Sequence, residues 1–148
     1  MALEVVRKYL RLPARDRAVL TRTVLTLGAA RLVTWLLPFA VGRRLLVGKQ
    51  RSTTPTLTRD QVRWAMAHAQ RVVPHATCLP QALAAEALLT RGGLPAELNI
   101  GVMKTGGKLA AHAWVESDGR IMVGDLGNEL AAYKRLPTLP RDWPGSGP

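Results

Sequence analysis

The chain has one cysteine, Cys78, among its 148 residues. A single thiol excludes an internal disulfide and gives no sign of an oxidising compartment. It also excludes a cysteine-rich zinc site, and His68 and His75 lack the spacing of a ligand pair, so we expect no bound metal. The glycine-containing stretch at 101–109 (GVMKTGGKL) does not have the spacing of a phosphate-binding loop and joins two expected strands. We therefore expect no cofactor.

Long apolar runs are also missing. The most apolar stretch covers the eleven residues 32–42 (LVTWLLPFAVG) and is broken by Pro38, so it is too short to span a bilayer. The first residues mix charged and apolar types and lack the layout of a signal peptide. These absences predict a cytoplasmic protein with no transmembrane segment.

Acidic and aromatic residues are scarce as well. Ten Asp and Glu against 21 Lys and Arg leave a formal charge of +11, which favours anionic partners. The basic residues are scattered and only 5% of the chain is aromatic, so no base-stacking platform is evident and we expect no nucleic-acid partner. A basic binding module for nucleic acid or anionic lipid, recognisable by salt-dependent binding, stays open as an alternative of another class.

The first third of the chain is apolar, basic and helical in pattern. Residues 2–11 place apolar side chains at helical spacing, and residues 14–37 read as one long or two short helices with Gly28 and Pro38 as break points. Residues 48–57 are polar and predict a connecting loop.

Two further helices carry start and stop signals. Thr58 with Gln61 forms a capping-box pattern that opens a helix ending at Pro74. Thr77 is the expected N-cap of the next helix, over residues 78–91, and Gly92 begins its stop signal.

Alternating segments follow and predict a small antiparallel sheet. The fold class is therefore α+β: a helix that bears the cysteine packs on a sheet that bears a histidine and an aspartate, with helices added at the N-terminus. The expected strands cover 98–102, 109–116 and 120–126. One compact domain is expected, divided into a helical region at 1–47, a core at 58–136 and a flexible tail at 137–148.

The second and third strands allow a geometric prediction. Asp118 and Gly119 are the preferred residues of a two-residue hairpin turn. With that turn, His112 lies directly opposite Asp125 on the same face, with Cβ atoms about 4.5–5.5 Å apart. A carboxylate in this position orients an imidazole and stabilises its charged form. The same register pairs Trp114 with Val123, where the indole is expected to exclude water and contact a substrate.

Cys78 lies in the first turn of its helix, where the helix dipole favours a thiolate. A helix N-terminus that presents Cys toward His and Asp on a sheet is the arrangement of papain-like cysteine enzymes. Taken singly, each residue is better explained by structure: Cys78 as a small buried residue, His112 as a core or edge histidine and Asp125 as a turn residue. Only together do they favour a catalytic site. The Cys78 N–H is the first expected oxyanion donor; the second lies either in the preceding segment or at Gln70.

Three stretches carry a resemblance: CLPQALAAEALLTRGGLPAELNIGV (78–102), AHAWVE (111–116) and VGD (123–125). They resemble the B2 proteins of lasso-peptide biosynthesis, small members of the transglutaminase-like branch of papain-like folds. The likeness begins near Leu12 and extends to about Pro137.

The resemblance implies a leader peptidase. Cys78 would be the nucleophile, His112 the base and Asp125 the orienting acid. The partners it implies are a leader–core precursor peptide, a separate leader-recognition protein (B1), and a cyclase acting on the released core. It also suggests the N-terminal helices as a docking surface, although they equally serve as a cover for the core. An acyltransferase that uses the same triad, with an amine resolving the thioester, remains the second enzymatic reading.

Overall fold

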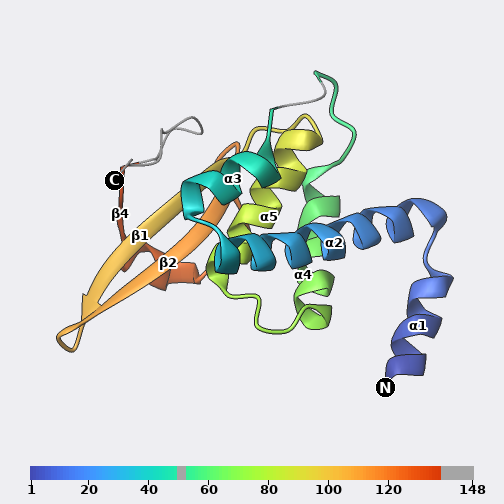
Figure 1. Ribbon diagram of the computed structural model, residues 1–148, viewed down its shortest axis with the longest axis horizontal. Coiled ribbons are helices and arrows are strands. Elements are labelled where there is room, and N and C mark those ends of the chain that lie inside the picture. Colours follow the sequence, from blue (N-terminus) through green and yellow to red (C-terminus); the bar gives the residue numbers. More distant parts are fainter. Residues whose placement is uncertain (50–52, 138–148) are drawn as a thin grey trace.

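The computed structural model describes residues 1–49 and 53–137, and shows helices packed against one face of an antiparallel sheet (Figure 1). This is the expected α+β class. The helices are α1 (Ala2–Arg11), α2 (Ala14–Leu36), α3 (Phe39–Val47), α4 (Arg59–Val72) and α5 (Cys78–Arg91). The strands are β1 (Glu97–Thr105), β2 (Lys108–Ser117), β3 (Arg120–Val123) and β4 (Lys134–Arg135), and a 3-10 helix, η1 (Gly127–Ala132), precedes β4.

The N-terminal helices differ in how they join the body. Helix α1 buries none of its residues and stands off the molecule at the end remote from the sheet (Figure 1). A hydrogen bond of 2.6 Å joins its Tyr9 hydroxyl to Thr21 of α2. Helix α2 continues through Gly28 without a break, and buries one stripe of residues at helical spacing: Val19, Thr23, Leu27 and Ala30.

Helix α2 also bears on the question of a membrane span. The helix contains part of the apolar stretch at 32–42 together with the apolar turns that precede it. With 23 residues, it is long and apolar enough to cross a bilayer. No other helix within residues 1–49 and 53–137 meets that criterion. Length and composition alone define the criterion, and the core helix of a soluble protein meets it too.

Helices α4 and α5 begin where their capping signals predict. The Thr58 hydroxyl accepts from the Gln61 N–H and the Gln61 side chain accepts from the Thr58 N–H, so the capping box is confirmed. Helix α5 begins at Cys78 and ends at Arg91, as predicted. Thr77 is its N-cap residue, but the hydroxyl makes no capping bond. Instead, the Gln81 side chain donates to the Ala76 carbonyl at 2.6 Å and holds the segment before Cys78 against the helix.

A buried ion pair joins α3 to α5. Arg43 donates from Nε to one Glu86 oxygen at 2.9 Å and from Nη2 to the other at 2.7 Å. Glu86 is fully buried and the Arg43 side chain is 7% exposed. This bidentate geometry compensates both charges inside the helical layer.

The sheet has the order β3-β2-β1-β4 with antiparallel neighbours. Asp118 (φ 48°) and Gly119 (φ 75°) form the predicted hairpin turn, and Ser117 pairs with Arg120. Since β4 pairs with β1 at the edge opposite β3, residues 124–133 cross a face of the sheet. Helix η1 and strand β4 were not predicted, and the tail expected at 137–148 lies outside the described residues from 138 onward.

The predicted register fails two residue pairs after the turn. A β-bulge between Val115 and Glu116 shifts the ladder, so Val123 pairs with Val115 rather than with Trp114. Strand β3 then ends at Val123, well before residue 126. The prediction that Asp125 lies opposite His112 is therefore wrong, because one extra residue in β3, Met122, breaks the alternation on which it rested.

Candidate active site

Cys78 is the first residue of α5 and is half-buried against the core. The first N–H groups of a helix have no intrahelical partner, and Pro80 contributes none, so Cys78 and Leu79 supply the leading backbone donors. These N–H groups and the helix dipole stabilise negative charge at this end of the helix. The local sequence thus places a thiol where a thiolate and an oxyanion are both favoured.

A cavity of about 440 Å³ lies beside this helix start. Thr77 and Pro80, which flank Cys78, form part of its wall, and Trp35 on α2 is 81% exposed at the same place. This size is in the range that holds a small molecule or a short stretch of peptide. The lining residues are Arg31, Leu32, Thr34 and Trp35 of α2, with His75, Thr77 and Pro80.

His112 is half-buried in β2, directly opposite Gly101 of β1. Its Nε2 lies 2.7 Å from the Gly124 carbonyl oxygen. The ring lies nearly parallel to Trp114, with centroids 6.2 Å apart, and 5.6 Å from the ring of Tyr133. One hydrogen bond and two aromatic neighbours therefore hold the imidazole.

Asp125 is exposed and does not contact His112 by a hydrogen bond or ion pair within the described part of the chain. Its Oδ1 accepts from the Gly127 N–H at 2.8 Å, which makes Asp125 a turn-stabilising residue. The hydrogen-bond partner of the imidazole is therefore the Gly124 carbonyl and not the Asp125 carboxylate.

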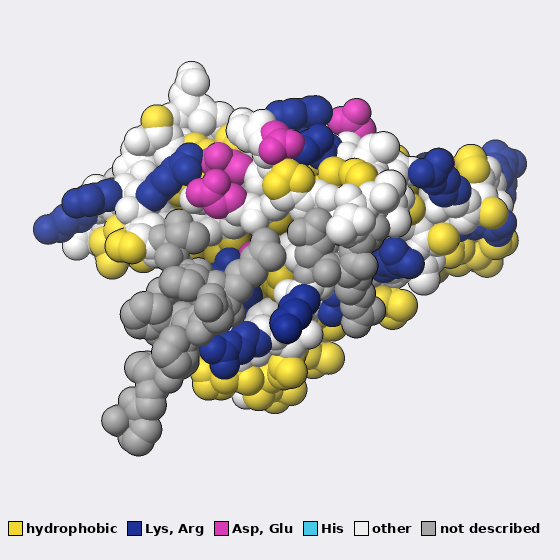
Figure 2. Space-filling view, turned by 90° about the horizontal axis from the view of Figure 1, so that it is seen from above, with side chains coloured by type: hydrophobic (Ala, Val, Ile, Leu, Met, Phe, Trp, Pro, Cys, Tyr) yellow, Lys and Arg dark blue, Asp and Glu magenta, His cyan; other side chains and the backbone are white. Residues whose placement is uncertain are grey.

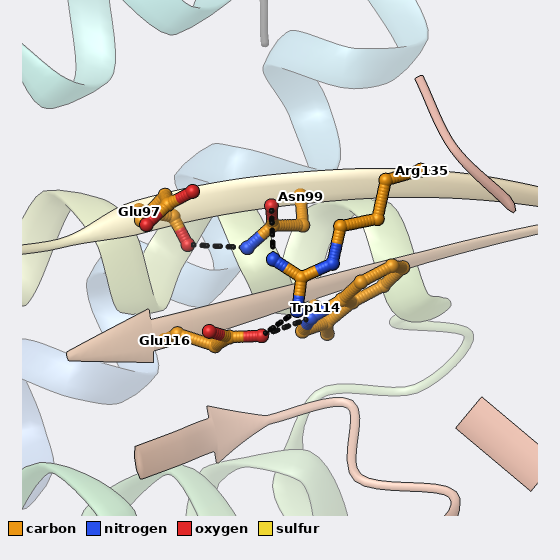
Figure 3. A network of polar contacts seen from close by, with 5 residues as sticks. All are labelled: Glu97, Asn99, Trp114, Glu116 and Arg135. Atoms are coloured by element: carbon orange, nitrogen blue, oxygen red, sulfur yellow. Dashed lines mark hydrogen bonds and ion pairs between the residues drawn. The ribbon is translucent and has the colours of Figure 1, made fainter. Parts of the chain in front are cut away.

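Trp114 is 1% exposed and has no surface for a substrate, contrary to its predicted contact. The Arg135 guanidinium lies 5.3 Å from the ring centroid and covers the indole, while Glu116 accepts from both Trp114 Nε1 at 2.9 Å and Arg135 Nη2 at 2.7 Å (Figure 3). Asn99 extends this network, accepting from Arg135 and donating to the Glu97 carbonyl. Trp114 therefore lies beside His112 on the same face of β2, with its ring nearly parallel to the imidazole.

Two glycines, which sequence reasoning did not single out, create room for this arrangement. A Cβ at Gly101 would lie 2.9 Å from Tyr133 Cβ and 3.0 Å from Trp114 Cζ3. A Cβ at Gly124 would lie 2.6 Å from the Ala113 carbonyl oxygen. Gly124 also has φ +81°, which favours glycine independently. The only sequence signal was Gly124 at the end of an alternating run, where a glycine marks a bend.

The structure does not bring Cys78 and His112 into hydrogen-bond contact, within residues 1–49 and 53–137. Ala113 and Val115 belong to the core shared with α5, so strand alternation puts His112 on the other face of β2. Cys78 and His112 nevertheless lie at similar positions along the direction of the strands. Helix α5 runs opposite to β1 (Figure 1) and its 14 residues span about 21 Å, or about six residues of strand. Six residues on from Glu97 along β1 is Met103, two residues beyond Gly101, which pairs with His112.

The edge of β2 beside His112 pairs with no strand on the β3 side in the described part of the chain, and Gly124 packs against it instead. Strand β3 ends at Val123, and Val115 is the last β2 residue that it pairs. No cluster of three or more His, Cys, Asp or Glu residues positioned for a metal ion occurs in the described ranges.

Comparison with known proteins gives one finding. Residues 23–138 match the transglutaminase-like superfamily, a match that includes Cys78, His112, Asp125 and the whole sheet. No curated protein and no solved structure is significantly similar to the chain. Because the match covers more than half of the sequence and joins the cysteine helix to the histidine strand, this chain belongs to the transglutaminase-like superfamily.

Proposed function

We propose that this protein is a cysteine peptidase that removes the leader from a lasso precursor peptide, with Cys78 as nucleophile and His112 as general base. One observation carries the proposal: the only thiol of the chain begins a buried helix, beside a cavity that a peptide segment can enter. Cysteine-type catalysis is common in the superfamily. The narrower assignment to lasso leaders rests on the resemblance of residues 78–102, 111–116 and 123–125 to B2 proteins.

The chemistry follows from these two groups. The Cys78 thiolate attacks the carbonyl at the leader–core junction, and the C–N bond breaks as His112 gives its proton to the departing amine of the core. The leader is then a thioester on Cys78. Water attacks this thioester, His112 takes the water proton, and the leader carboxylic acid leaves with the thiolate restored.

Contact between the two groups requires the His112 side chain to leave the Gly124 carbonyl and turn toward the helix start past the edge of β2. Apo active sites often have long catalytic contacts that tighten once substrate is bound. We expect His112 to turn toward Cys78 when a peptide lies in the cavity beside Cys78.

The exposed faces of α1 and α2 support a partner-docking role. Leu3, Val6 and Leu10 of α1 are more than half exposed, as are Leu32, Trp35 and Leu36 of α2. Basic and hydrophobic side chains lie together at the end of the molecule that α1 forms (right in Figure 2). Exposed apolar side chains beside cations fit a partner surface of apolar and acidic character. We propose that the leader-recognition protein and the leader dock here.

The test of the peptidase is mass spectrometry of a lasso precursor incubated with this protein, with and without the leader-recognition protein. We expect free leader and core with the wild-type chain and intact precursor with Cys78→Ala. A leader mass increased by water shows hydrolysis, whereas attachment of an amine shows acyl transfer and replaces the peptidase by the acyltransferase. Cleavage by Cys78→Ala would contradict both.

The docking surface has its own test. Leu10→Glu should reduce cleavage that depends on the leader-recognition protein by tenfold or more, because a charge replaces an apolar contact worth about 1–3 kcal/mol. The melting temperature should not change, since α1 buries no residue. Leu109→Glu is the matched control, another leucine that is more than half exposed, on the β1–β2 hairpin. Equal losses in both variants would argue against docking at α1.

A further inference from the structure

The cavity beside Cys78 is bounded by two stretches of chain that contain no acidic residue. One wall is the last part of α2, which supplies Arg31 and Trp35, and the other is the segment that leads into the first turn of α5. No Asp or Glu occurs in residues 17–59 or 61–85, which include both walls. Among the described residues that line the cavity, none is acidic. The chain therefore supplies no carboxylate of its own to a cation in this wall.

The α2 wall ends in groups that only donate hydrogen bonds. Arg31 and Trp35 are four residues apart, so they lie on the same side of the helix. The guanidinium carries five N–H donors and the indole one, and neither group accepts. Neither end group forms a hydrogen bond or an ion pair with another residue in 1–49 or 53–137. Across the cavity, the Thr77 hydroxyl makes no capping bond to α5.

A carboxylate is the peptide side-chain group that this set of donors fits best. It has two acceptor oxygens and no hydrogen, and a guanidinium binds it through two parallel hydrogen bonds. The net charge of +11 raises the local concentration of an anionic ligand. Leu32 and Pro80 supply apolar surface in the same wall for the methylene groups that carry the carboxylate.

We propose that this cavity is a subsite for an acidic side chain of the leader, close to the scissile bond, and that Arg31 selects that side chain. The proposal deepens the proposed function and rests on it only for the position of the cleaved bond. The leader crosses the exposed apolar side chains of α2 and places Glu or Asp in the cavity, next to Cys78 at the start of α5. Arg31 determines specificity and takes no part in breaking the bond.

Binding to the subsite can be measured without any cleavage. The probes are two peptides, Ac-Ala-Ala-Glu-Ala-NH2 and Ac-Ala-Ala-Gln-Ala-NH2, titrated into the full-length Cys78→Ala protein. The indole N–H signals in ¹⁵N NMR spectra report binding, and Trp35→Phe identifies the Trp35 signal among the four tryptophans. We expect the Trp35 signal to shift with the glutamate peptide. The dissociation constant of the glutamine peptide should be about fivefold higher, the order expected for an exposed ion pair.

Arg31→Gln should remove this preference, so that the two peptides bind equally. Arg63→Gln is the matched control, because Arg63 is an exposed arginine of α4 that does not line the cavity. It makes the same change in net charge and should leave the preference intact. Equal dissociation constants of the two peptides for the Cys78→Ala protein, or an unshifted Trp35 signal, would overturn the proposal. Equal losses in Arg31→Gln and Arg63→Gln would also overturn it, since binding would then follow net charge alone.

Cleavage assays separate the subsite from the peptidase. Precursor variants carry Glu or Gln at one of the four leader residues before the junction, and kcat/KM is compared for wild-type protein and Arg31→Gln. At one position we expect Glu to exceed Gln by about fivefold with wild-type protein and not with Arg31→Gln. Cleavage with no such preference at any position would overturn the subsite and leave the peptidase standing. Selective binding of the glutamate peptide with no cleavage of any precursor would support the subsite and contradict the proposed function.

Discussion

Replacing His112 with alanine should reduce precursor cleavage by on the order of 10⁴-fold or more. The imidazole carries the protons in both halves of the proposed reaction, so its loss removes both the acid for the departing amine and the base for the attacking water. Single-turnover cleavage followed by mass spectrometry measures this loss, with thermal unfolding to confirm that the variant is folded.

His68→Ala is the matched control for this loss. His68 lies on the exposed side of α4, where its Nδ1 contacts the Trp64 carbonyl. We expect full activity from it. A folded His112→Ala variant that cleaves within tenfold of wild type would contradict the catalytic role of His112.

The second large effect is on stability. Glu86→Ala should lower the free energy of unfolding by about 3–5 kcal/mol, because it leaves the buried Arg43 guanidinium without its carboxylate. Replacing both members by apolar residues, Arg43→Met with Glu86→Leu, should recover most of that loss, since neither charge is then buried unpaired. Urea unfolding at equilibrium measures all three variants.

An exposed pair supplies the comparison. Asp60 accepts from Arg120 at 3.2 Å, with both side chains more than half exposed. Asp60→Ala should change the free energy of unfolding by less than about 1 kcal/mol. If Glu86→Ala were no more costly than Asp60→Ala, the ion pair would not hold α3 to α5.

Local signals in the sequence predicted local structure well. The boundaries of α5 follow from Thr77 and the glycines after Arg91, and the start of α4 from the box of Thr58 and Gln61. The turn at Asp118 and Gly119 was equally predictable, because their positive φ values are rare for other residue pairs. Each of these signals acts within four residues.

Features that depend on distant contacts were not predictable. The bulge at Val115 and Glu116 leaves no mark in the alternating pattern, yet it moves Asp125 away from His112. Strand β4 has two residues and exists through its pairing with Gly101 and Val102. The burial of Glu86 within an Ala- and Leu-rich helix was visible only as an isolated charge, and its partner lies 43 residues away.

The candidate site shows the same division. Position along the chain made Cys78 and His112 candidates, whereas the atom that contacts the imidazole is a backbone carbonyl, which residue type does not encode. Trp114 was placed correctly on the His112 face but its cover by Arg135, from the other edge of the sheet, was not foreseen.

The most direct test of the account is to trap the acyl-enzyme. Wild-type protein, precursor and leader-recognition protein are mixed, quenched in acid within the first turnover, and analysed by intact-mass and peptide mass spectrometry. We predict a population heavier by the leader acyl group, with the modification on Cys78, lost on treatment with hydroxylamine and absent from Cys78→Ala. Released core peptide with no acyl group on Cys78 at any time, or continued release by Cys78→Ala, would contradict the account.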